Sequence, residues 1–245
     1  MVTEVFLVAL VTDIATGLGV LPLAILDRRS ARWPGLAAGF AGGMMLSASV
    51  FALADKALRR GNAVEVVGGM LAGAAFFAVS ARIIAARHWQ LHDWSEAASR
   101  RSIVVVATMF VHSIPEGIAI GVGYATGEIR FGLLLAIAIA VHNIPEGTAV
   151  ALPLRANGAR LWSCFGYAVL TSVPQPIVAV PSYLLVSVAQ PLLAPSLGFA
   201  GGAMIFLVVA ELLPDSLAVC TREETAWAVT VGLVAMLGFT AALGV

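Results

Sequence analysis

Long apolar runs constrain this chain more than any other feature of its sequence. About 20 apolar residues are needed to cross the hydrocarbon core of a bilayer, and eight such runs follow one another with short polar connections. We therefore predict an all-α polytopic membrane protein with eight transmembrane helices. The predicted spans are residues 3–26, 35–57, 63–86, 102–125, 130–153, 161–187, 196–219 and 224–244.

The amino-acid composition is that of a membrane protein rather than of a soluble domain. Of the 245 residues, 60% are hydrophobic and 11% are charged, whereas a soluble domain usually carries about 25% charged residues. The eight spans use up the chain, so we expect one transmembrane domain over residues 1–245, with the lipid bilayer as its surroundings. The formal net charge of zero gives no indication of nucleic acid as a partner. The two cysteines lie on different predicted helices and are expected to pack rather than to form a disulfide.

The distribution of Lys and Arg predicts the orientation in the membrane. With the N-terminus outside, ten of the 14 Lys and Arg residues fall in cytoplasmic loops and four in outer loops, and cytoplasmic loops usually carry the excess. We therefore expect both termini on the extracytoplasmic side of the cell (inner) membrane, with a cytosolic loop at about 87–101. The loop after the second span opposes this assignment, because it places Lys56, Arg59 and Arg60 outside.

One motif, V-H-x-I-P-E-G, occurs twice, 30 residues apart, at 111–117 and 141–147. On a helix, His at position i and Glu at i+4 share a face. The proline at i+3 lacks an N–H, so it frees a carbonyl one turn back and tends to kink the helix. The glycine after the Glu allows another backbone to come close.

The acidic residues of this motif lie inside predicted spans. An ionised carboxylate in hydrocarbon is costly, so intramembrane acids are functional candidates by default. Two Glu and two neutral His would offer a nitrogen and oxygen ligand shell of charge −2, which suits a divalent transition metal. The predicted metal ligands are His112, Glu116, His142 and Glu146.

A second repeat flanks the motif pair. Residues 41–45 (AGGMM) resemble residues 200–204 (AGGAM) at an offset of 159, and the same offset pairs Thr12 with Thr171 and Gly73 with Gly232. The paired spans cross the membrane in opposite directions in the predicted topology, which is the pattern of inverted repeats. We expect a 3+2+3 arrangement with repeat units at about 1–86, 102–153 and 161–245.

The doubled H-x-x-P-E-G motif on adjacent membrane helices resembles the ZIP (Zrt/Irt-like) metal transporters, in particular their GufA-like bacterial branch. The resemblance implies a carrier that moves Zn²⁺ into the cytosol by alternating access, with Fe²⁺, Mn²⁺ and Cd²⁺ as other candidate substrates and no resident cofactor. It also implies a homodimer. The expected motion is elevator-like, with spans one, four, five and six moving against the other four.

Three further residues are candidates for the metal site or its pathway. Met45 lies in a span that resembles the ZIP helix with a Met near the metal, although a lone Met is more often core filler. Glu211 lies in a stretch, ELLPD, that resembles the family's E-L-x-P-E and is a candidate relay ligand. Asp13, in the middle of the first span, fits the metal path and a paired structural acid equally well.

His88 and His92 lie in the predicted cytosolic loop, where many ZIP proteins carry a His-rich segment. They form a weak metal site at most, and a solvated loop is the simpler interpretation.

Some ZIP relatives bind two metals, and the residues of their second site differ in this chain. The corresponding positions carry Ser113, Asn143 and Gln175, the last in a stretch that resembles the family's G-x-x-E-P with Gln at the acid. One dication balances the charge of two carboxylates, whereas two dications leave an excess that is costly in a low-dielectric site. We predict one metal per protomer, with these three residues as its hydrogen-bonding neighbours. The alternative is that another acid, such as Asp13, completes a second site.

Two other classes of function remain as alternatives. An intramembrane metalloenzyme would need a motif such as H-E-x-x-H or the E-x-x-H of di-iron bundles, and this sequence contains neither. A membrane protein with a static, metal-sensing site is the second alternative. A measurement of metal flux across the membrane would distinguish a carrier from both of these alternatives.

Overall fold

The computed structural model describes residues 1–25, 32–86, 96–156 and 158–243, and within these ranges every regular element is helical. Eight helical segments are long and apolar enough to cross a membrane, so the prediction of an all-α protein with eight spans is confirmed. The helices are α1 (Val2–Leu18), α2 (Leu21–Ile25), α3 (Arg32–Ser47), α4 (Asp55–Arg60), α5 (Ala63–Ala86), α6 (Glu96–Ala125), α7 (Ile129–Ala156), α8 (Leu161–Ser172), α9 (Pro174–Val188), α10 (Leu193–Leu207), α11 (Leu213–Val219) and α12 (Arg222–Leu243).

Several helices extend beyond the predicted spans. The second span covers Arg32–Arg60 rather than residues 35–57, and the seventh covers Gln190–Val219 rather than 196–219. Hydropathy marks only the part of a helix that lies in hydrocarbon, and polar ends can continue the helix into the headgroup region. At the end of the second span, Arg59 Nε donates to Asp55 Oδ2 at 2.7 Å, an i,i+4 pair that supports this extra turn.

Two spans contain a π-helical segment, η1 (Ala48–Ala54) in the second and η3 (Val208–Leu212) in the seventh. A short 3₁₀ segment, η2 (Gln190–Leu192), precedes α10. The sixth span is interrupted between α8 and α9, where Pro174 begins the second helix, a position that suits proline because the first N–H groups of a helix have no partner within it.

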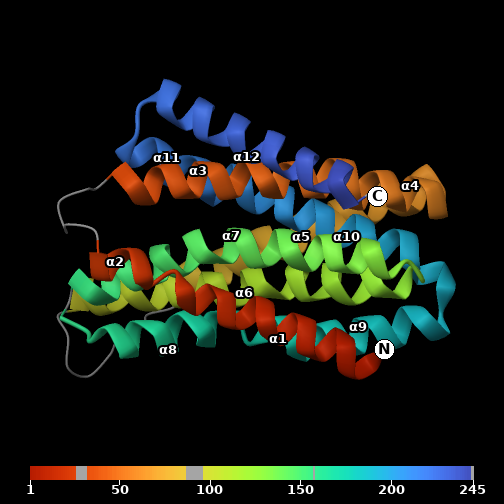
Figure 1. Cartoon of the computed structure of the whole chain (residues 1–245), viewed down its shortest axis with the longest axis horizontal. Helices are drawn as coiled ribbons and strands as arrows, with labels where there is room; N and C mark the ends of the chain where they lie inside the picture. Colours follow the sequence, from red (N-terminus) through yellow and green to blue (C-terminus); the bar gives the residue numbers. More distant parts are fainter. Residues whose placement is uncertain (26–31, 87–95, 157, 244–245) are drawn as a thin grey trace.

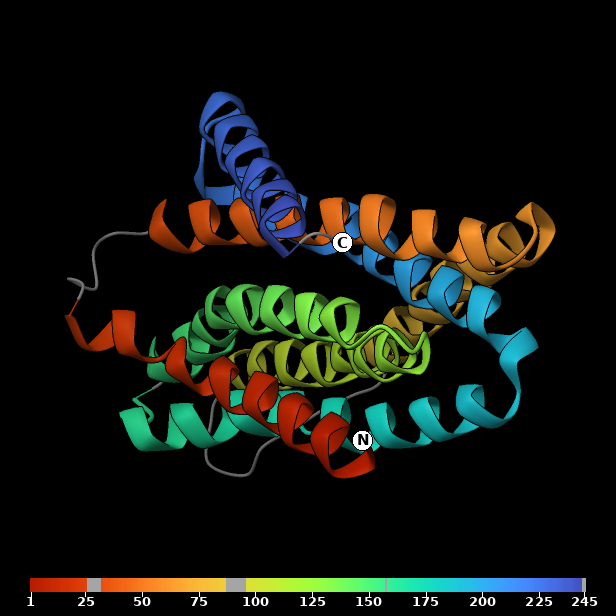
Figure 2. The same cartoon turned by 45° about the vertical axis from the view of Figure 1, so that its right-hand side comes forward.

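The helices form two bundles (Figures 1 and 2). In the first, which we call the α3/α12 bundle, α3 packs on α12 and α5 packs on α10. In the second, the α6/α7 bundle, α6 packs on α9 and α1 packs on α7, with α8 against both motif helices. The α6/α7 bundle contains spans one, four, five and six, and the α3/α12 bundle contains the other four. The two motif helices lie in the centre of the molecule, where α10 and α3 of the other bundle contact them.

Local structure recurs at the sequence offset of 159. Gly43 of α3 lies against the backbone of Val229, and Gly202 of α10 lies against the backbone of Met70, so the two crossings are related by that offset. The same is true of two helix starts. Asn62 and Glu65 exchange backbone-to-side-chain hydrogen bonds before α5, and Thr221 and Glu224 do so before α12. These pairs are capping boxes, which satisfy the free N–H groups of a first helical turn.

Two further predictions concern the cysteines and the loop histidines. Cys164 and Cys220 are both free and buried, as expected. His88 and His92 lie outside the described residues, as does most of the predicted cytosolic loop.

Candidate metal centre

The two motif helices run side by side and place their four candidate ligands between them. Both α6 and α7 continue through the motif prolines, Pro115 and Pro145. The hairpin between them is short, so the two motifs meet at the same depth. The four candidate ligands, His112, Glu116, His142 and Glu146, are all buried, and none is more than 5% exposed.

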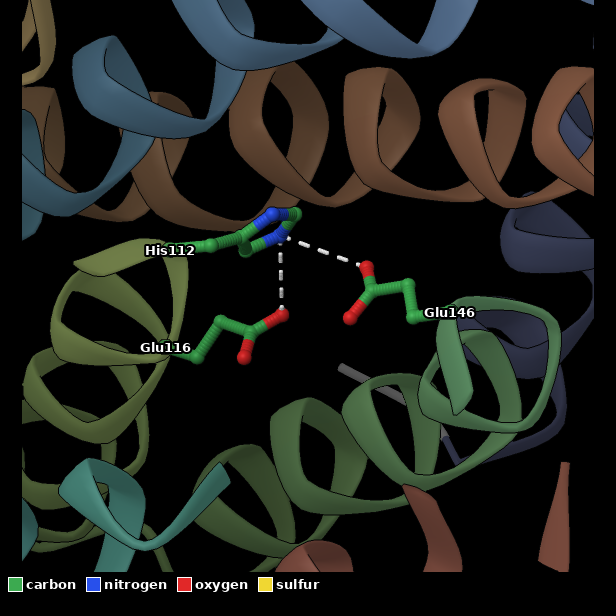
Figure 3. A group of neighbouring side chains, drawn as sticks. All are labelled: His112, Glu116 and Glu146. Atoms are coloured by element: carbon green, nitrogen blue, oxygen red, sulfur yellow. Dashed lines mark ion pairs between the residues drawn. The ribbon is translucent and has the colours of Figure 1, made fainter. Parts of the chain in front are cut away.

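The shortest contacts in this cluster cross from one helix to the other. His142 Nε2 lies 2.7 Å from Glu116 Oε1, and His112 Nε2 lies 3.2 Å from Glu146 Oε1. The i,i+4 pairs within each helix are longer, at 3.4 Å for His112 with Glu116 and 3.9 Å for His142 with Glu146. Figure 3 shows His112, Glu116 and Glu146 pointing toward one another from the two helices.

Three of the four candidate ligands are spaced as in the ligand shell of a metal ion. Bonds of about 2.0–2.1 Å to zinc place neighbouring ligand atoms about 3.3 Å apart, and the four His–Glu distances range from 2.7 to 3.9 Å around that value. Ligand atoms of His112, Glu116 and Glu146 all lie within 4.8 Å of one another. Although His112 Nε2 is 3.2–3.4 Å from two carboxylate oxygens, it makes no hydrogen bond with acceptable angles. His142 Nε2 and Glu116 Oε1 are hydrogen-bonded to each other, whereas His112 Nε2 and Glu146 Oε1 are left without a partner among the described residues.

Glu116 is held by a buried chain of hydrogen bonds. Gln175 Nε2 donates to Glu116 Oε2 at 2.6 Å. The amide oxygen of Gln175 accepts in turn from Thr12 Oγ1 at 2.6 Å and from Asn143 Nδ2 at 3.3 Å. Asn143 Nδ2 also reaches the carbonyl of Thr12 at 2.9 Å. Since Oε2 is engaged by Gln175, only Oε1 of Glu116 is directed at the other ligands.

The remaining ligands have fewer partners. Oε1 of Glu146 and both ring nitrogens of His112 are buried without a hydrogen-bond partner in the described structure. The imidazole of His112 packs edge-on against Phe77 of α5, with ring centroids 6.4 Å apart. Buried polar atoms in proteins are nearly always paired, so this group of orphaned ligand atoms is what a binding site for a cation requires.

The structure places the other predicted residues at different distances from this cluster. Gln175 and Asn143 belong to the hydrogen-bond chain just described, whereas the hydroxyl of Ser113 lies 3.2 Å from the carbonyl of Met109 in its own helix. Met45 is fully buried in the apolar core, and a role for it as ligand stays a prediction.

Asp13 and Glu211 lie outside the group of converging ligand atoms. Asp13 is buried in α1, with Oδ1 unpaired. Glu211 lies in η3, half-buried and close enough to His112 for their charges to interact. Pathway roles for both stay predictions.

Sequence reasoning did not assign a role to Thr12 or Phe77. Thr12 was visible only as one member of the 159-residue repeat, and its contact with Gln175 joins residues that are 163 positions apart. Phe77 is one of many aromatic residues in apolar runs. No local pattern marks either residue, because each contact depends on how α1 and α5 pack around the motif helices.

The donor types of this cluster suit a divalent ion that must be released again after binding. A site of mixed His and carboxylate ligands also releases its metal ion more readily than a site of four thiolates.

Comparison with known proteins gives a consistent result. The family model described as ZIP Zinc transporter matches residues 92–240. The chain is 34% identical to the zinc transporter GufA of Myxococcus xanthus over 219 residues, which covers 85% of this chain and 86% of that protein. It is 36% identical to the zinc transporter ZIPB of Bordetella bronchiseptica over 241 residues, covering 90% of this chain and 74% of that protein. A longer protein of Arabidopsis thaliana is 36% identical over 96% of this chain, which spans only 38% of the length of that relative.

Proposed function

The chain belongs to the ZIP family of zinc transporters, and on that premise we propose that it carries Zn²⁺ across the cell membrane into the cytosol. One observation carries the proposal. Ligand atoms of His112, Glu116 and Glu146 lie within 4.8 Å of one another between the two motif helices, and His142 Nε2 lies 2.7 Å from Glu116 Oε1. Two relatives that match most of this chain are named zinc transporters.

We propose one metal per protomer as substrate, bound by His112, Glu116, His142 and Glu146. The charge of two carboxylates balances one dication. Gln175 occupies the second oxygen of Glu116 as a hydrogen-bond donor, and an amide N–H faces a cation unfavourably. A second ion beside Glu116 would therefore have to displace this amide from a fully buried position.

We propose that alternating access arises from movement of the α6/α7 bundle against the α3/α12 bundle, the two groups into which the helices pack. The recurrence of crossings and capping boxes at the offset of 159 supports the 3+2+3 inverted repeat. Extracytoplasmic termini, location in the inner membrane and a homodimer belong to the same proposal.

The test is metal uptake by purified protein in liposomes, with Zn²⁺ inside measured by a trapped fluorescent chelator. The wild type should accumulate Zn²⁺, and Fe²⁺, Mn²⁺ and Cd²⁺ are then compared as competitors. The matched control is a Glu116→Ala, Glu146→Ala variant, which keeps the fold but lacks both charges of the site. Tight binding without flux in the wild type would indicate a static site, and equal flux in the variant would contradict the assigned ligands.

Stoichiometry has a separate test. Anomalous scattering from a cadmium-soaked crystal should give one strong peak among the four ligands. Gln175→Glu should create a second peak, because it places a third carboxylate beside Glu116. Two full-occupancy peaks in the wild type would refute the single-site proposal.

A further inference from the structure

The connection between the two motif helices is tied to the opposite bundle by charged side chains. Glu128 lies between α6 and α7, and its carboxylate accepts from Lys56 and from Arg60 of α4, with Arg60 Nη2 at 2.8 Å from Oε1. Arg60 also lies 3.4 Å from the carbonyl of Thr126. Since α4 continues the second span, these contacts join the α6/α7 bundle to the α3/α12 bundle.

Lys56 is more than a solvated surface charge. Its side chain is only 16% exposed, and its ammonium group lies 5.0 Å from the ring centroid of Phe131 in the first turn of α7. The hydrogen bond from Lys56, together with that from Arg60, lowers the pKa of Glu128. Three groups of one hairpin, at positions 126, 128 and 131, therefore face two cations of the other bundle.

The far end of the same interface is open. A cleft of about 830 Å³ lies between the bundles and is lined by the beginnings of α3 and α12, including Trp33 and Trp227. It extends to Val141, Ile144 and Pro145 of the second motif, the neighbours of His142 and Glu146. Residues 32 and 60 begin and end one continuous helical span, so the cleft and the Glu128 contacts lie at opposite ends of the interface.

From this difference we infer that Lys56, Arg60 and Glu128 form a bracket that holds one end of the interface shut and opens during each transport cycle. The inference rests on the proposed function, because only a carrier needs the two ends to open alternately. With the bracket closed, the cleft reaches from the other end to residues next to the metal centre. The other end opens when the hairpin carrying Glu128 leaves α4.

The three cations that oppose the predicted orientation all have acidic partners. Lys56 and Arg60 pair with Glu128, and Arg59 pairs with Asp55 at 2.7 Å. Each has an acidic partner at the same end of the protein. The Asp55–Arg59 pair has the same chemistry on the same helix but stays within α4, so it provides a matched control.

The first experiment locks the bracket. In a background with Cys164→Ser and Cys220→Ser, Lys56→Cys and Glu128→Cys are joined by a short thiol cross-linker in liposomes. Uptake should fall to about a tenth or less and return on reduction, while Zn²⁺ binding measured by calorimetry persists. Asp55→Cys with Arg59→Cys, cross-linked in the same way, should transport at its uncross-linked rate. A bracket pair that fails to cross-link, or that transports equally when cross-linked, overturns the inference.

The second experiment needs no metal and so separates this inference from the proposed function. Thr126→Cys reports on the buried turn that follows α6, since Thr126 is only 7% exposed. Glu128→Gln should raise its alkylation rate by a membrane-impermeant maleimide about threefold to fivefold, the factor expected for losing two partly exposed ion pairs. Asp55→Asn should leave that rate unchanged. Equal rates in all three proteins, or an equal rise with Asp55→Asn, would overturn the bracket even if the wild type transports zinc.

Discussion

The two copies of the V-H-x-I-P-E-G motif have the same residues but different surroundings. Glu116, in the first copy, is fully buried with one oxygen bonded to His142 and the other to Gln175. Glu146, in the second copy, is 5% exposed and its Oε1 has no hydrogen-bond partner among the described residues. One candidate ligand is therefore held by hydrogen bonds through both oxygens, and the other has an oxygen without such a bond in the described structure.

A single side chain accounts for most of this difference. Gly117 packs against the backbone of Gln175 in α9, and Gly147 packs against the backbone of Thr16 in α1. Residues 16 and 175 are related by the 159-residue offset. The amide of Gln175 reaches Glu116, but the shorter hydroxyl of Thr16 pairs with Ser172 at 2.6 Å instead. A carrier must bind and release its substrate, and a site with one carboxylate held through both oxygens and one held less fully suits both steps.

The largest expected effect comes from removing either carboxylate. Glu116→Ala and Glu146→Ala should each lower Zn²⁺ uptake by about 100-fold or more, because an unbalanced dication in a buried site costs several kcal/mol. Only Glu116→Ala should also lower the melting temperature in detergent, since it leaves the buried amide of Gln175 without an acceptor, a loss of about 1–3 kcal/mol. Similar melting temperatures for the two variants would remove the distinction between the copies. His112→Ala and His142→Ala should lose uptake as well.

A smaller effect is expected from removing the support of Glu116. Gln175→Leu should weaken Zn²⁺ affinity by about 10–100-fold, the usual result of losing a partner that orients a metal ligand. Thr16→Val, the equivalent change on α1, should alter affinity little because Thr16 touches no ligand in the described structure. Calorimetric titration of the two purified variants would measure the difference, and equal losses of affinity would show that Gln175 does not act through Glu116.

The smallest effect concerns the residues that follow the motif histidines. Asn143→Ser removes the amide that donates to Gln175 and to the Thr12 carbonyl, and Zn²⁺ affinity should fall about threefold to tenfold, as for the loss of one or two hydrogen bonds. Ser113→Ala should have no measurable effect, because within the described residues the Ser113 hydroxyl bonds the Met109 carbonyl of its own helix and no candidate ligand. A loss with Ser113→Ala as large as that with Asn143→Ser would contradict this assignment.

Features set by local sequence were predicted well. Helix type and span number follow from hydropathy, because lipid forces each backbone segment to satisfy its own hydrogen bonds. The four candidate ligands follow from the i,i+4 spacing of His and Glu in apolar runs. Span ends were displaced, for example to Arg60 in the second span, because hydropathy does not register the polar turns that extend a helix. Met45, Asp13 and Glu211 were named from position or resemblance, and their roles stay predictions.

The sequence by itself determined that this chain crosses the membrane eight times and carries two His–Glu pairs on neighbouring helices. Only the tertiary structure decided that His142 pairs with Glu116, that Gln175 and Thr12 support this carboxylate, and that Glu128 reaches Lys56 and Arg60. The physical reason is the distance along the sequence over which each effect acts. Hydropathy and helical periodicity act over a few residues, whereas these contacts join positions 26 to 163 residues apart and depend on the register in which whole helices pack.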